Sequence, residues 1–388
     1  MIRGDPTPGT AGPGARPRGL LLAGGAVALL AGLTGALVLL GLPMPAVTLR
    51  LGVVHGLLMT FGFLGTLVSL ERAVALGRGW GYLAPLASAL GALALLLGAD
   101  TAGTWLFVVA GVAFAGIYAA FDRIERSLHG TVQAGGAAAW LGGAILLALG
   151  RPIESGVPWI AAFLILTVVG ERLELSRVTR PSEFARQAFG LACLVLLAGV
   201  LLSAVVADPG TRLAGAGILG LAAWLGRFDI ARRTVRARGV TRFIAASLLP
   251  GYAWLAVGGA IWLAVGQPVG SGYDASLHAL FLGFVMSMVF GHAPLILPAV
   301  LRLPLPYRPR FYAHLALLHL GLLVRIGTGD LLGIPGAWQL GGLLNVTALL
   351  VFLASSVAAA LEGRRERPPM SRRAGSARTG PAGTDERG

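Results

Sequence analysis

Charge is the scarcest property of this 388-residue sequence. Asp, Glu, Lys and Arg together make up 12% of it, whereas soluble globular domains contain about 25%. Hydrophobic residues make up 56%, and the mean hydropathy is +0.78. This balance excludes a soluble domain and indicates a protein that spans a lipid bilayer several times.

Lysine is absent, so all 31 basic residues are arginine, and the formal net charge is +14. In a soluble protein such an excess would suggest nucleic-acid binding, but these arginines lie in short segments between apolar stretches. We therefore read the charge as a topology signal, and nucleic acid is not an expected partner.

Cysteine and catalytic motifs are also scarce. The single cysteine, Cys193, lies in an apolar stretch, which excludes a disulfide framework and a CxxC metal site. There is no HExxH motif, no Ser/His/Asp set and no glycine-rich phosphate loop after a strand. Because these motifs are absent, the sequence predicts none of the catalytic activities that they support.

What the sequence does contain is a series of apolar segments, most of them long enough to cross a hydrocarbon core of about 30 Å. They predict an all-α, polytopic bundle of about twelve transmembrane helices. Abundant glycine within them predicts close helix packing. The predicted spans are 20–42, 51–70, 82–98, 103–121, 130–149, 157–174, 187–206, 212–227, 243–265, 274–297, 311–326 and 336–361.

The arginines orient this bundle. With the N-terminus in the cytoplasm, 27 arginines fall on the inner side and four on the outer side, as the positive-inside rule requires. We predict a multi-pass protein of the bacterial cytoplasmic (inner) membrane with both termini cytoplasmic. Residues 1–18 and 362–388 are predicted to be disordered cytoplasmic tails, flanking a transmembrane domain over 19–361.

The inner ends of several spans carry acid–arginine pairs, as in SLERAVALGR (69–78) and VGERLELSR (169–177). They can be read as a weak repeat of four spans, which would arrange the helices in three arcs of four. They can equally be salt-bridged anchors at helix ends. A proton entry path from the cytoplasm is a further interpretation.

The histidines within the predicted spans need an explanation, because placing an ionisable side chain in a bilayer costs free energy. His55 and His278 each lie about five residues inside the outer end of their span. Two imidazoles at matching depth suit the axial ligation of a haem b, and Arg50 and Arg325 lie on the correct side to hold its propionates. Alternatively, each histidine could simply bond a backbone carbonyl or interfacial water.

A second pair is His292 and His314. His292 follows His278 by 14 residues, which returns it to nearly the same helix face roughly 21 Å further along. His314 enters from the cytoplasmic side at a similar depth, so the two could form an inner metal or haem site. The GHAP motif (291–294) could equally be a proline-kinked helix end.

The segment HGLLMTFGF (55–63) resembles the second helix of haem–copper oxidase subunit I, and LHALFLG (277–283) with Gly291-His292 is similar to the NnrS family of twelve-span membrane proteins. The resemblance implies His55 and His278 as haem ligands, Arg325 beyond the eleventh span, copper as a further candidate, and a link to nitric oxide. The sixth and seventh spans contain no histidine, so it does not extend to a haem–copper centre.

The leading hypothesis is therefore a membrane protein that binds haem b and acts with a redox partner in electron transfer, or in sensing or handling nitric oxide or oxygen. A haem-free transporter is the alternative, with helices interrupted at Pro250-Gly251 and Pro294 around a substrate site. A structural or assembly factor with incidental histidines is a third reading.

Overall fold

The computed structural model describes residues 14–176 and 181–366, and within these ranges the chain is all-α, without strands. Predicted tail residues 1–13 and 367–388 lie outside the described ranges. The predicted tail boundaries were wrong by about one helical turn at each end. Residues 15–18 form the start of the first helix, and residues 362–365 form the end of the last.

The helices follow the predicted spans. The first segments are α1 (Ala15–Leu39), η1 (Ala46–Thr48), α2 (Leu49–Leu57), η2 (Leu58–Gly65), α3 (Thr66–Leu76), η3 (Gly79–Tyr82) and α4 (Leu83–Leu96). The middle ones are α5 (Asp100–Asp122), α6 (Leu128–Ala148), α7 (Ile153–Leu175), α8 (Glu183–Ser203), α9 (Ala207–Phe228) and α10 (Ala231–Thr234). The last are α11 (Gly239–Val265), α12 (Gly270–Leu277), η5 (His278–Met286), α13 (Ser287–Leu301), α14 (Phe311–Leu322), η6 (Leu323–Asp330) and α15 (Pro335–Arg365).

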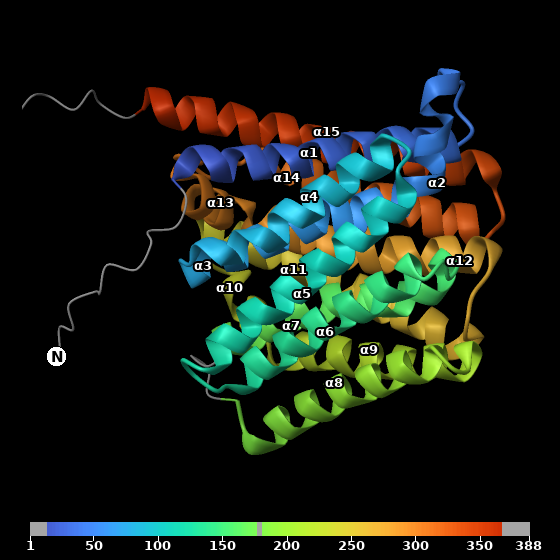
Figure 1. Cartoon of the computed structure of the whole chain (residues 1–388), viewed down its shortest axis with the longest axis horizontal. Helices are drawn as coiled ribbons and strands as arrows, with labels where there is room; N and C mark the ends of the chain where they lie inside the picture. Colours follow the sequence, from blue (N-terminus) through green and yellow to red (C-terminus); the bar gives the residue numbers. More distant parts are fainter. Residues whose placement is uncertain (1–13, 177–180, 367–388) are drawn as a thin grey trace, which may run out of the picture.

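Eleven of the described helical segments are long and apolar enough to cross a membrane, which makes this a multi-pass membrane protein. The predicted span 212–227 corresponds to α9, which is not among the eleven because Asp208, Arg212 and Arg227 shorten its apolar stretch. α9 nevertheless packs in the bundle against α8 and α11. The start of α1 and the end of α15 lie at the same end of the bundle (Figure 1).

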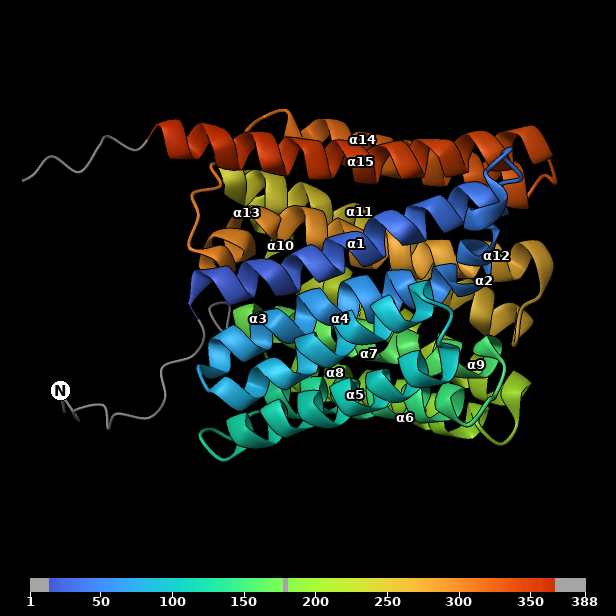
Figure 2. The same cartoon turned by 45° about the horizontal axis from the view of Figure 1, so that its top comes forward.

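Glycine lets neighbouring helices approach closely, as the composition predicted. A Cβ placed on Gly199 of α8 would collide with the backbone nitrogen of Ala214 in α9. Such contacts are how helices associate where water supplies no driving force. Figure 2 shows the consequence, a set of long helices lying roughly along one direction.

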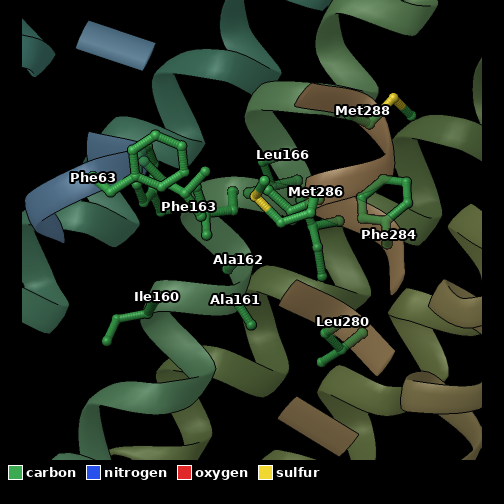
Figure 3. Close-up of a cluster of buried hydrophobic side chains, with 14 of the residues drawn as sticks. Phe63, Ile160, Ala161, Ala162, Phe163, Leu166, Leu280, Phe284, Met286 and Met288 are labelled. Atoms are coloured by element: carbon green, nitrogen blue, oxygen red, sulfur yellow. The ribbon is translucent and has the colours of Figure 1, made fainter. Parts of the chain in front are cut away.

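The core is centred on α7, which lies between the second and tenth spans. Its apolar side chains include Phe163 and Leu166, and they meet Phe63 of η2 and Met286 of η5 (Figure 3). All four are buried. This packing joins the two helices that carry His55 and His278 through a common neighbour.

The predicted helix interruptions are absent. α11 runs unbroken through Pro250, and α13 runs unbroken through Pro294 and Pro298. The discontinuous helices expected of a transporter at these prolines were therefore a wrong prediction.

The inner acid–arginine pairs are salt-bridged anchors, as one interpretation of the sequence held. Arg72 of α3 pairs with both Glu71 and Glu171, the latter on α7. Arg172 makes two hydrogen bonds of 2.9 Å to Asp229, which follows α9. These pairs join the helices at the end of the bundle where α1 starts. The grouping of the helices into three arcs stays a prediction.

Candidate functional site

His55 is held in place by the packing of α2 against α1. Its Nδ1 lies 2.7 Å from the carbonyl oxygen of Gly32. A Cβ on Gly35, one turn further along α1, would lie 3.2 Å from the His55 Cβ and would collide with the Leu51 carbonyl oxygen. Glycines at 32 and 35 thus bring the two helices close enough for a backbone carbonyl to orient the imidazole.

His278 is oriented by its own helix. Its Nδ1 lies 2.8 Å from the carbonyl oxygen of Asp274, one turn earlier, and 3.4 Å from the Asp274 carboxylate. The side chain of His278 keeps 21% of its accessible surface. It is therefore oriented but not enclosed by protein atoms.

Asp274 is in turn fixed by two other elements. Arg325 of η6 donates two hydrogen bonds to its carboxylate, at 2.8 and 2.7 Å, and Trp338 of α15 donates a third at 3.1 Å. The guanidinium of Arg325 lies over the Trp338 ring, 4.9 Å from the centroid. This charged, largely buried cluster joins three spans around His278.

The two imidazoles have their proton on the same ring nitrogen. Because a carbonyl can only accept, Nδ1 carries the proton in each ring and Nε2 keeps its lone pair when the ring is neutral. Among the residues that the structure describes, Nε2 of neither ring has a hydrogen-bond partner. This is the state in which histidine binds a metal.

The helices that carry the two rings do not pack tightly at this level. Within the described residues, α3 packs against α13, whereas α2 and α12 make at most isolated contacts. The second and tenth spans thus meet at the end of the bundle where α1 starts and separate at the opposite end, which carries His55 and His278.

π-helical segments adjoin the site on three spans. One starts three residues after His55, one starts at His278, and one contains Arg325. Such wide turns are rare and are frequently found at functional sites. The hydrophobic pattern did not predict them.

The two predicted propionate ligands already have protein partners. Arg325 is 8% exposed in its pair with Asp274. Arg50 pairs with Asp100 and donates to the Leu95 carbonyl oxygen at 3.1 Å, with its side chain 39% exposed. Sequence reasoning missed Asp274, although its position one turn before His278 was a usable signal, and it missed Trp338, which only the tertiary fold brings near.

The other predicted ligands lie elsewhere. His292 of α13 lines an apolar cavity near the start of α1, with Nδ1 2.9 Å from the Met288 carbonyl oxygen. His314 does not line this cavity and is surrounded by Phe243, Phe290, Phe311 and Phe352, with neither ring nitrogen hydrogen-bonded. Within 14–176 and 181–366, no three His, Cys, Asp or Glu residues gather as a metal site would require.

The donor set at His55 and His278 fits a haem with two imidazole ligands. Each ring is oriented by a carbonyl at Nδ1, so that Nε2 is the nitrogen left to bind a metal when the ring is neutral. Nearby side chains such as Leu51, Met59 and Phe281 are apolar and partly accessible, which suits a macrocycle. Three protein ligands to one metal ion are not present there among the described residues.

Residues 18–361 match the family model described as Domain of unknown function (DUF8744). No curated protein matches the chain.

Proposed function

Since the chain belongs to the DUF8744 family, which is described only as a domain of unknown function, we propose its function from the site itself. We propose that it is a b-type cytochrome of the membrane, with His55 and His278 as the axial ligands of one haem. It would act in electron transfer, or in sensing or handling nitric oxide or oxygen. The resemblance of 55–63 and 277–283 to haem-binding helices supports the same assignment.

One observation carries the proposal: two imidazoles from different spans share one tautomer and leave both Nε2 atoms free. A histidine that merely satisfies itself in a core would be expected to use both ring nitrogens or to be enclosed, as His314 is. Here the backbone carbonyls of Gly32 and Asp274 hold the rings ready to donate their lone pairs.

When bound, the haem would supply a one-electron iron couple. The residues of this chain hold and orient it: His55 and His278 provide the ligands, and Leu51, Met59 and Phe281 provide an apolar surround. The Asp274–Arg325–Trp338 cluster holds the helical turn before His278 in place. Because Asp274 already neutralises the charge of Arg325, this arginine does not need a haem propionate as its partner. Arg50, the more exposed of the two arginines, is the better placed to turn towards a propionate at the membrane surface.

The proposed location follows from charge and topology. The start of α1 and the end of α15 lie at one end of the bundle (Figure 1), and the sequence assigns 27 of the 31 arginines to this side if the helices alternate in direction. We place this end in the cytoplasm of a bacterium and the His55–His278 site in the outer half of its inner membrane. A redox partner would then approach from the outer surface.

Absorption spectroscopy of purified variants tests the ligand assignment. We expect a sharp α band in the reduced-minus-oxidised spectrum of the wild type, and we expect His55→Ala and His278→Ala each to abolish it. His314→Leu is the matched control, because it removes a buried imidazole outside the site. Retention of the band in both alanine variants, or its loss in the control alone, would contradict the assignment.

A further inference from the structure

A second site lies in the opposite, arginine-rich half of the bundle. A cavity of ≈ 520 Å³ is enclosed by α1, η2 with α3, α7, η5 with α13, and α15. This volume is in the range of small-molecule sites. Its wall is almost entirely aliphatic and aromatic, with Phe63, Leu164 and Val285 at the end nearer the outer half.

Polar groups gather on one part of this wall. His292, Glu71 and Glu171 all line the cavity, and His292 interacts electrostatically with Glu171. Nδ1 of His292 is bonded to the Met288 carbonyl oxygen, and its Nε2 has no partner among the described residues. The neutral ring therefore offers a hydrogen-bond acceptor in the cavity, next to a carboxylate.

The buried arginines at this wall are paired with carboxylates, whereas Arg364, which also lines the cavity, is exposed. Glu71 and Glu171 share Arg72, with side chains 26% and 25% exposed, and Arg172 is paired with Asp229. The site around His292 thus has no unpaired buried cation to hold a phosphate. It favours an uncharged head group that hydrogen-bonds, because an unpaired anion there would be costly.

The mouth of the cavity is apolar. Val357 and Leu361 of α15 line it and are 59% and 51% exposed. In a membrane such side chains contact lipid, so the cavity is entered from the bilayer between α15 and α1. A ligand reaching His292 by this route must itself be soluble in lipid.

We propose that this cavity binds an isoprenoid quinone or its quinol. A quinol hydroxyl would donate to Nε2 of His292, the ring would lie among the apolar side chains, and the isoprenoid tail would leave past Val357 and Leu361. The proposal concerns binding alone. It stands whether or not the outer site holds haem.

The test uses the full-length protein in detergent, with quinones and phospholipids extracted and quantified. We expect about one quinone per chain to copurify, and a short-chain ubiquinone or menaquinone to bind the delipidated protein in calorimetric titrations. His292→Leu should weaken this binding about tenfold, as expected for loss of one buried hydrogen bond. Ala23→Trp, which fills the cavity from α1, should abolish it.

The control is His314→Leu, which changes a buried histidine that does not line the cavity and should bind quinone as the wild type does. Three results would overturn the proposal: no quinone bound to folded wild type, unchanged binding in both cavity variants, or extraction of phospholipid alone. Haem absorbance is recorded on the same samples. Its loss in His292→Leu without a quinone effect would identify His292 as a haem ligand, also against this proposal.

Discussion

Asp274 makes more of the interactions around His278 than any other single residue. Its carbonyl orients His278, and its carboxylate binds Arg325 and Trp338. A carboxylate one turn before a candidate ligand could have been recognised in the sequence, because both lie on one helix face. The partners could not, since η6 and α15 meet Asp274 only through tertiary packing.

Replacing Asp274 is expected to be costly. Asp274→Asn removes the carboxylate that is hydrogen-bonded to the nearly buried Arg325 cation, so we expect a loss of about 3–5 kcal/mol in unfolding free energy. Thermal unfolding in detergent measures it. Arg50→Gln is the control, because its pair with Asp100 is exposed and should contribute at most about 1 kcal/mol. Equal losses in the two variants would contradict the buried cluster.

At the scale of elements, the apolar pattern predicted nearly all of the helices and the placement of His55 and His278 in separate spans. It could not predict η2, η5 and η6, because a π turn alters the backbone without altering hydrophobicity. It also started the first helix too late and ended the last helix too early, since the arginines at 16, 18, 364 and 365 look like tail residues but lie within the helices.

The close contact of α1 with α2 gives a prediction at this scale. Gly35→Ala should separate the two helices, because its Cβ would meet the Leu51 carbonyl oxygen, and should cost about 1–3 kcal/mol. We expect the haem band to weaken as well, since His55 would lose its Gly32 partner.

The control for this variant is Gly190→Ala in α8, where an added Cβ meets nothing within 4 Å. It should leave stability unchanged or raise it by about 0.4–1 kcal/mol. Thermal midpoints and spectra of the two variants, compared side by side, check both expectations. A Gly35→Ala protein as stable and as coloured as the control would show that the contact is not required.

At the scale of the whole molecule, orientation is the property that the arginine distribution predicts and that the fold alone leaves open. Leu97 and Ile124 are suitable reporters because they lie at opposite ends of α5 and are 77% and 72% exposed. The single native cysteine, Cys193, is buried.

Cysteine labelling on intact cells therefore tests the topology. In a Cys193→Ser background, a membrane-impermeant maleimide should label Leu97→Cys at the outer surface and spare Ile124→Cys until the cells are opened. The reverse pattern would place the termini outside and move the His55–His278 site to the cytoplasmic half.

The haem content of the purified protein tests the central claim most directly. The wild type, produced in a haem-replete host, should contain about one haem b per chain at the His55–His278 site, with the electron paramagnetic resonance signal of a low-spin ferric iron between two imidazoles. A haem that persists with this signal in the His55→Ala/His278→Ala double variant would contradict the account, and so would a folded wild type that contains no haem.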